Sequence, residues 1–118
     1  DEALMLDPQG FVSSCNATNL FIVRDGQVLT STGEYCFNGV TRANVIDLCR
    51  ADGIPVALCD FPLDMAHAAD EAFVTGTFGG LTPVREIDGH VLPKALPGPV
   101  TTRLRDLYAA LKDREAGL

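Results

Sequence analysis

The sequence predicts an α/β fold, a mixed sheet or pseudo-barrel flanked by two helices near residues 41–52 and 101–114. One observation is the helical spacing of apolar residues in both segments, which gives each segment a single apolar face. Another is a set of short apolar runs bounded by Gly, Pro, Asn and Asp, which is typical of strands. The third is the order of the elements, because the first helix stops at Gly53 and a strand follows at once.

The first part of the chain predicts strands and turns. Residues 20–23 form an apolar run that ends at Asp25-Gly26, a strong hairpin signal, and residues 28–30 return as its partner strand. An Asp-Pro-Gln-Gly turn at residues 7–10 separates two earlier extended segments. We therefore expect strands at residues 3–6, 11–16, 20–23 and 28–30, followed by a loop over residues 31–38.

From Thr41 the pattern becomes helical. The apolar face of this helix is formed by Val45, Ile46, Leu48 and Cys49. Its charged residues are expected mostly off that face: Arg42, Asp47 and Arg50.

The second part of the chain predicts three further strands and two helices. The strands are expected at residues 55–59, 71–74 and 81–87, the last interrupted by Pro83 and followed by a hairpin turn at Asp88-Gly89. A short helix is expected at residues 63–69 and a proline-rich connector at residues 93–99. The final helix has a buried stripe of apolar side chains: Leu104, Leu107, Tyr108 and Leu111.

Composition excludes several classes of function. The 118 residues suit one domain, residues 1–118, and the formal net charge of −7 disfavours binding to nucleic acid or to anionic membranes. No apolar stretch is long enough to span a bilayer. The cysteines form no C-x-x-C pair, and neither His67 nor His90 lies at a ligand-like spacing from them. We expect no metal site and a cytoplasmic protein with buried free thiols: Cys15, Cys36, Cys49 and Cys59.

The chain opens inside a predicted strand, with Asp1-Glu2-Ala3-Leu4 and no initiator methionine. We therefore expect a fragment of a longer protein. A strand edge near residues 3–6 would need a partner from the missing sequence or from another chain, which favours self-association.

Two glycine-containing loops are candidate anion sites. Asn38-Gly39-Val40-Thr41-Arg42 opens directly into the first helix, whose free amides and positive dipole end suit a phosphate. The alternative is that Thr41 only caps its own helix.

The second loop, residues 75–80 (Thr-Gly-Thr-Phe-Gly-Gly), follows a strand, and its glycines allow close approach of a ligand to the backbone. It could equally be an ordinary turn. Residues 13–19 are small and polar, and they form either an irregular strand or the lining of a pocket.

These pieces together resemble the fold-type IV pyridoxal-phosphate enzymes of aminotransferase class IV, most closely the C-terminal domain of branched-chain amino acid aminotransferases. The resemblance covers nearly the whole chain. The motifs that carry it, in order, are Asn19-Leu20-Phe21, Gly26, Gly39-Val40-Thr41-Arg42, Ala69-Asp70-Glu71-Ala72-Phe73, Thr75-Gly76-Thr77, Thr82-Pro83-Val84, Ile87-Asp88-Gly89 and Gly98-Pro99-Val100-Thr101.

The resemblance implies a pyridoxal 5'-phosphate site. Thr77 and Phe78 would meet the substrate carboxylate through their backbone amides. An amino acid and a 2-oxo acid would be the substrates, and the protein would be a homodimer or a higher homo-oligomer. The residues that would hold the cofactor are Ser14, Gly39, Val40, Thr41, Gly76 and Thr77.

The sequence departs from the family pattern at two points. The family's Schiff-base lysine lies upstream of Asp1, and neither Lys94 nor Lys112 matches it, so no catalytic residue is assigned and the chain alone is expected to be inactive. Family members usually place a glutamate beside the pyridine nitrogen at the position of Ser14, and a hydroxyl supports the protonated ring far less.

Several functions remain open at this level. Within the family the alternatives are a D-amino acid aminotransferase and an aminodeoxychorismate lyase. Outside it, the alternative is a non-catalytic domain that binds an anion or self-associates.

Overall fold

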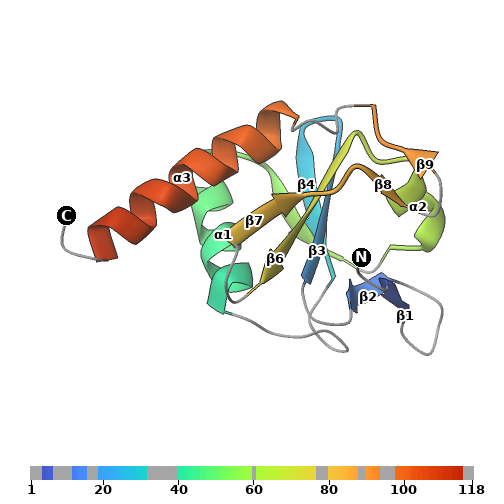
Figure 1. The fold of residues 1–118 in the computed structure, drawn as a ribbon, viewed down its shortest axis with the longest axis horizontal. Coiled ribbons are helices and arrows are strands. Elements are labelled where there is room, and N and C mark those ends of the chain that lie inside the picture. The colour runs from blue at the N-terminus through green and yellow to red at the C-terminus, as the bar shows by residue number, and fades with distance from the viewer. Residues whose placement is uncertain are drawn as a thin grey trace.

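A computed structural model describes residues 4–6, 12–15, 19–31, 40–59, 61–76, 80–87, 90–93 and 98–115 (Figure 1). In these ranges the strands are β1 (Leu4–Leu6), β2 (Val12–Cys15), β3 (Asn19–Arg24), β4 (Gln27–Thr30), β5 (Val56–Leu58), β6 (Glu71–Gly76), β7 (Gly80–Pro83), β8 (Glu86–Ile87) and β9 (His90–Val91). The helices are α1 (Val40–Ala51), α2 (Leu63–His67) and α3 (Pro99–Glu115).

A mixed five-stranded sheet forms the centre of the molecule. Its strand order is β5-β4-β3-β6-β7, and β4 and β5 run parallel while the other neighbours run antiparallel. Two small antiparallel pairs, β1 with β2 and β8 with β9, lie beside it. The predicted mixed sheet flanked by helices is therefore confirmed.

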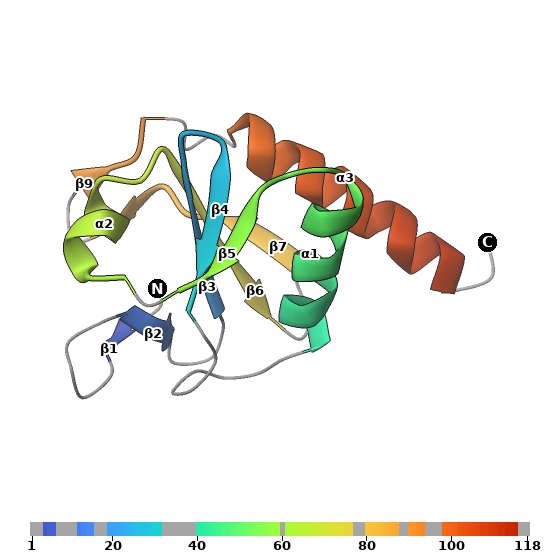
Figure 2. The same ribbon diagram turned by 180° about the vertical axis from the view of Figure 1, so that it is seen from behind.

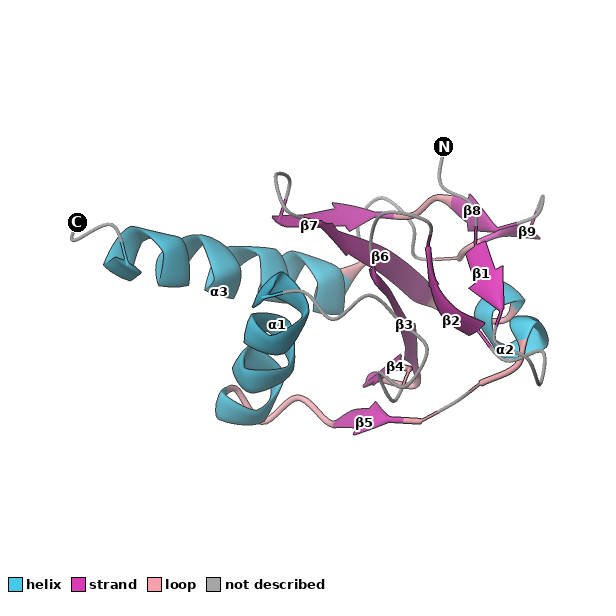
Figure 3. Ribbon diagram, turned by 90° about the horizontal axis from the view of Figure 1, so that it is seen from below, coloured by secondary structure: helices cyan, strands magenta, loops and turns pink. Residues whose placement is uncertain are grey.

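The central sheet is covered on both faces. Figure 3 shows α1 and α3 on one side and α2 with the two small strand pairs on the other. Because successive side chains of a strand point to opposite faces, β3 supplies both cores. Phe21 and Val23 join the α1–α3 core, where the rings of Phe21 and Phe73 stack with their centroids 4.9 Å apart. Leu20 and Ile22 join the core on the α2 side.

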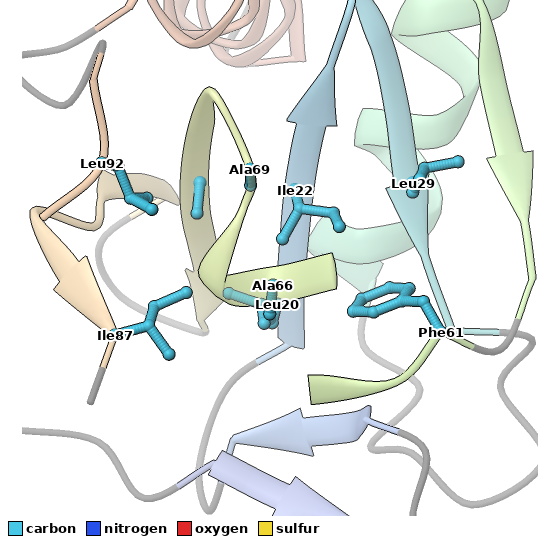
Figure 4. Close-up of a cluster of buried hydrophobic side chains, with 9 residues drawn as sticks. Leu20, Ile22, Leu29, Phe61, Ala66, Ala69, Ile87 and Leu92 are labelled. Carbon is cyan, nitrogen blue, oxygen red and sulfur yellow. The ribbon is translucent and has the colours of Figure 1, made fainter. Parts of the chain in front are cut away.

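The α2-side core is closed by residues that arrive from several elements (Figure 4). Phe61, which precedes α2, is 1% exposed and lies in the same cluster as Leu20 and Ile22. Ala66 of α2 and Ile87 of β8 complete the cover, so the short helix and the β8–β9 pair are held in place by apolar packing.

The β3–β4 connection is a tight hairpin, as predicted. Asp25 and Gly26 both have positive φ angles, 50° and 78°, which the two central residues of a primed turn require. The amide of Asp25 donates to Oδ2 of Asp70 over 3.0 Å, which ties the turn to the residue before β6.

Several predicted boundaries shift by one or two residues: α1 begins at Val40, α2 ends at His67 and β6 continues to Gly76. Three other differences concern the later part of the chain. The single strand expected over residues 81–87 is two strands, because the chain leaves the central sheet after Pro83 and β8 pairs with β9 instead. The final helix begins at Pro99 rather than Thr101, since proline is tolerated in a first helical turn, where its missing N–H needs no partner. His90, expected in a turn, is the first residue of β9.

The start of α3 is anchored on β6. The carboxylate of Glu71 accepts hydrogen bonds from the amides of Val100 and Thr101, at 3.2 and 2.9 Å. Glu71 is 2% exposed and so acts as a buried cap supplied from a distant strand. Gly98, whose carbonyl accepts the first helical hydrogen bond from Thr102, leaves the room that this carboxyl occupies.

Candidate functional site

Four polar residues gather at one end of the central sheet. The register pairs Asn19 at the start of β3 with Thr75 near the end of β6. It also pairs Phe21 with Thr30, so Ser31, which follows β4, lies at the same end. The start of α1 lies near this end as well (Figures 1 and 2). Arg42 in its first turn is hydrogen-bonded to Ser31. We call Asn19, Ser31, Arg42 and Thr75 the polar end of the sheet.

The polar end is buried, and part of its hydrogen-bonding capacity is unused. All four residues are at most 7% exposed. Each carries a buried side-chain atom that has no hydrogen-bond partner among the described residues: Asn19 Oδ1, Ser31 Oγ, Arg42 Nε and Thr75 Oγ1. Since buried polar groups in native proteins are nearly always paired, such a concentration is typical of a place where a ligand or an ordered water supplies the partners.

Arg42 was expected mostly off the apolar face of α1, and this prediction is wrong. It lies three, four and seven residues before Val45, Ile46 and Cys49, which places it on the same buried face. Its Nη2 donates to the carbonyl oxygen of Ser31 over 2.7 Å. Helical spacing was the signal that could have identified Arg42, whereas Ser31 carried no signal in its predicted loop.

Thr30 shows how the same end is satisfied where no ligand is needed. Its side chain is 1% exposed, and its Oγ1 donates to the carbonyl oxygen of Leu20 over 2.9 Å. The hydroxyls of Ser31 and Thr75 have no such partner, although they are almost as deeply buried.

The first turn of α1 contributes backbone donors to this end. The first amides of any helix lack a partner within the helix, and the dipole makes that end positive. The first turn of α1 carries no acidic residue. At the start of α3, by contrast, the carboxylate of Glu71 occupies the equivalent place. The two helix starts are thus arranged differently, one closed by a carboxylate of the chain and one facing the polar end.

The structure brings part of the predicted site together. Val40 and Thr41 are the first residues of α1, and Gly76 is the last residue of β6, at the polar end of the sheet. Ser14 lies in β2, which contacts β3 and is placed near the same end in Figures 1 and 2. The remaining predicted site residues lie outside the described residues: Gly39, Thr77 and Phe78.

The two histidines, distant in sequence, meet in space. The rings of His67 and His90 stack with centroids 4.3 Å apart and planes 18° from parallel. Such rings direct their nitrogen lone pairs side by side rather than toward a common point. Within the described ranges no group of three or more His, Cys, Asp or Glu residues is placed to hold a metal ion.

In the described part of the chain, Cys49 is buried and Cys59 is half-buried, and neither forms a disulfide bond. Among the described residues, no helix is long and apolar enough to cross a membrane.

Comparison with known proteins decides the family. The family model described as amino-transferase class IV matches residues 1–87, most of the chain. The chain belongs to the amino-transferase class IV family.

Curated class IV relatives span two substrate types. A branched-chain-amino-acid aminotransferase-like protein of Arabidopsis thaliana is 45% identical over 113 residues, 96% of this chain and 20% of the relative. The branched-chain-amino-acid aminotransferase of Pseudomonas aeruginosa is 40% identical over 108 residues, 92% of this chain and 35% of the relative. A D-alanine aminotransferase of Listeria monocytogenes is 35% identical over 107 residues, 90% of this chain and 37% of the relative.

Solved class IV structures share the fold. The branched-chain amino acid aminotransferase of Escherichia coli superposes with a TM-score of 0.88 at 34% identity, covering 93% of this chain and 38% of that one. The pyridoxal-phosphate form of the Thermobaculum terrenum enzyme gives a TM-score of 0.89 at 35% identity, covering 94% and 37%. The chain thus spans little more than a third of the length of these solved relatives.

Proposed function

We propose that this chain is the C-terminal, cofactor-binding domain of a pyridoxal-phosphate-dependent aminotransferase of the branched-chain type. The observation that carries the proposal is the polar end of the sheet, where α1 begins beside four buried polar atoms without partners. A phosphate suits this place because its oxygens can accept from the hydroxyls of Ser31 and Thr75 and from Nε of Arg42, and because the start of a helix stabilises its charge. The Oδ1 atom of Asn19 is itself an acceptor and needs a donor instead. The pyridoxal-phosphate form of the Thermobaculum terrenum relative supports the assignment.

Five residues would hold the phosphate. In our proposal Val40 and Thr41 donate their backbone amides, Thr41 adds its hydroxyl, and Gly39 allows the phosphate to approach the helix start. Gly76 and Thr77 close the site from the end of β6. When bound, pyridoxal phosphate supplies an electron sink for bonds broken at the substrate α-carbon.

Ser14 and the second loop would orient the rest of the cofactor and the substrate. Ser14 would lie beside the pyridine nitrogen, and the amides of Thr77 and Phe78 would bind the substrate carboxylate. A hydroxyl at residue 14 stabilises a protonated ring less than a carboxylate does, so we propose slower amino transfer than with a glutamate there.

The chain alone lacks the Schiff-base lysine that would carry out the proton transfers. Lys94 and Lys112 are its only lysines, and neither occupies the position of the family's Schiff-base lysine. Lys112 lies near the end of α3 with its ammonium 5.8 Å from the ring centroid of Tyr108. We propose that the domain binds cofactor and that turnover requires a lysine-bearing N-terminal domain.

The substrates proposed for the whole enzyme are a branched-chain amino acid and a 2-oxo acid. Because the relatives include a D-alanine aminotransferase, a D-amino acid is the second candidate substrate. The third candidate is aminodeoxychorismate, if the whole enzyme is an aminodeoxychorismate lyase. The full reading frame that encodes this chain should be assayed with L-leucine, D-alanine and aminodeoxychorismate. We expect amino transfer from L-leucine to 2-oxoglutarate. Absence of amino transfer from any donor would leave a non-catalytic anion-binding domain as the better assignment.

We further propose a cytoplasmic homodimer that binds neither nucleic acid nor membranes. Cys49 and Cys59 form no disulfide bond, which suits a reducing compartment, and the net charge of −7 opposes binding to polyanions.

A further inference from the structure

We propose that Arg42 is a positioning residue for the cofactor phosphate, holding the start of α1 against the end of β4. This inference rests on the function proposed above and adds a residue that the class IV resemblance did not assign to the site.

The hydrogen bond of Arg42 spans two elements. Ser31 is the first residue after β4, and Arg42 lies in the first turn of α1. The 2.7 Å bond from Nη2 to the carbonyl oxygen of Ser31 therefore joins the two ends of the connection between β4 and α1. A charge-assisted bond of this length is among the stronger ones in proteins. It fixes where α1 begins relative to the sheet.

Stability alone does not account for a guanidinium at this place. Arg42 is 7% exposed and continues the face formed by Val45, Ile46 and Cys49, which is otherwise apolar. Its Nε has no hydrogen-bond partner within the described part of the chain. Burying a charge in this way is unfavourable unless an anion or further acceptors compensate.

The position of Arg42 connects it to the phosphate rather than to the cofactor ring. The amides of Thr41 and Val40 precede it by one and two residues, so a shift of the first turn moves these donors directly. The buried positive charge also adds to the positive end of the helix dipole. Loss of Arg42 should therefore weaken the binding of phosphorylated ligands and leave contacts to the pyridine ring unchanged.

The test compares two ligands that differ only in the phosphate. Pyridoxamine 5'-phosphate and pyridoxamine carry an amine in place of the aldehyde, so neither reacts with Lys94 or Lys112. Calorimetric titration of the 118-residue chain gives the ratio of the two affinities. We expect Arg42→Met to lower this phosphate preference by roughly tenfold, as for loss of a hydrogen bond to a charged group.

Arg42→Lys and Arg50→Met complete the design. Lysine keeps the charge but not the forked donor set, so we expect a preference between those of wild type and Arg42→Met. Arg50 is exposed in the last turn of the same helix, and its substitution should leave the preference unchanged. Thermal unfolding shows whether each variant is folded. If Arg42→Met does not fold, Arg42→Lys serves as the test variant.

The outcomes separate this inference from the proposed function. One set of results overturns the role of Arg42 alone. In that set wild type prefers the phosphorylated ligand, Arg42→Lys shows the same preference, and Arg42→Met either shows the same preference or does not fold. Equal weakening of both ligands in a folded Arg42 variant also contradicts it, because that result indicates a general structural role. Wild type without any phosphate preference overturns the proposed function and this inference with it.

Discussion

Cys49 lies on the face of α1 that packs against the sheet, and its side chain is fully buried. Burial raises the pKa of this thiol to about 11; the charge of Arg50 lowers it and that of Asp52 raises it further. The folded chain therefore keeps the proton at pH values where an unfolded thiol, with a pKa of 9.0, has lost it. By linkage, the stability contributed by this difference is present below pH 9 and is lost as the pH rises through about 11.

We expect the free energy of unfolding of wild type to fall more steeply above pH 9 than that of Cys49→Ala. Urea unfolding at several pH values between about 8 and about 11 measures both. The alanine variant loses stability at every pH because of the cavity, so the comparison concerns the slope and not the absolute value. Parallel pH profiles would show that Cys49 is not protected by burial.

At the residue scale, the sequence predicted which residues have suitable chemistry for the candidate site better than it predicted which side chains are buried. Asn19 fell within a segment predicted as a candidate pocket lining and Thr75 within a candidate anion loop, and the structure places them as a cross-strand pair. Arg42 was misplaced because charge was given more weight than its helical spacing. Ser31 could not be predicted, since its role comes from a carbonyl oxygen that every residue has.

At the scale of elements, α3 depends on β6 for the satisfaction of its first turn. Pro99 at the first helical position has no N–H to satisfy. The amides of the next two residues, Val100 and Thr101, donate to the carboxylate of Glu71. A Cβ at residue 98 would overlap the carboxyl group of Glu71. Gly98 and Glu71 together therefore fix the start of α3.

We expect Gly98→Ala to destabilise the chain by about 1–3 kcal/mol, because the displaced carboxylate leaves buried amides without a partner. Urea unfolding measures the loss. In a Glu71→Ala background the same substitution should be much less destabilising, since the group it displaces is gone, so a double-mutant cycle should show strong coupling. Additive losses would mean that Gly98 serves the helix start without Glu71.

Helices and hairpins were predictable as elements because local sequence determines them. The Asp25-Gly26 turn and the apolar face of α1 are both local signals. The division of residues 81–87 into β7 and β8 was not predictable, because it depends on β8 finding β9 outside the central sheet. The early start of α3 likewise depends on a cap that comes from β6.

At the scale of the whole molecule, the candidate site is a product of long-range pairing. β3, β4, β6 and α1 contribute to the polar end from three separated stretches of sequence. The two glycine-containing loops were predicted from sequence as candidate anion sites, but only the register of the sheet shows that their neighbours share one buried end.

The molecule also carries features that favour association. β5 and β7 are the edges of the central sheet within the described residues, and Leu58 of β5 and Val91 of β9 are exposed large apolar residues. We expect a dimer or a higher oligomer in a light-scattering concentration series. A monomer that persists at high micromolar concentration would contradict this prediction.

The most direct measurement is an NMR titration of the ¹⁵N-labelled 118-residue chain with pyridoxamine 5'-phosphate. We expect the largest saturable amide shifts at Val40, Thr41, Ser31 and Gly76, with no shift near Lys112 at the end of α3. This pattern would place the phosphate at the polar end of the sheet. No saturable shift, or shifts centred on α3 or on the β8–β9 pair, would contradict the cofactor-binding function.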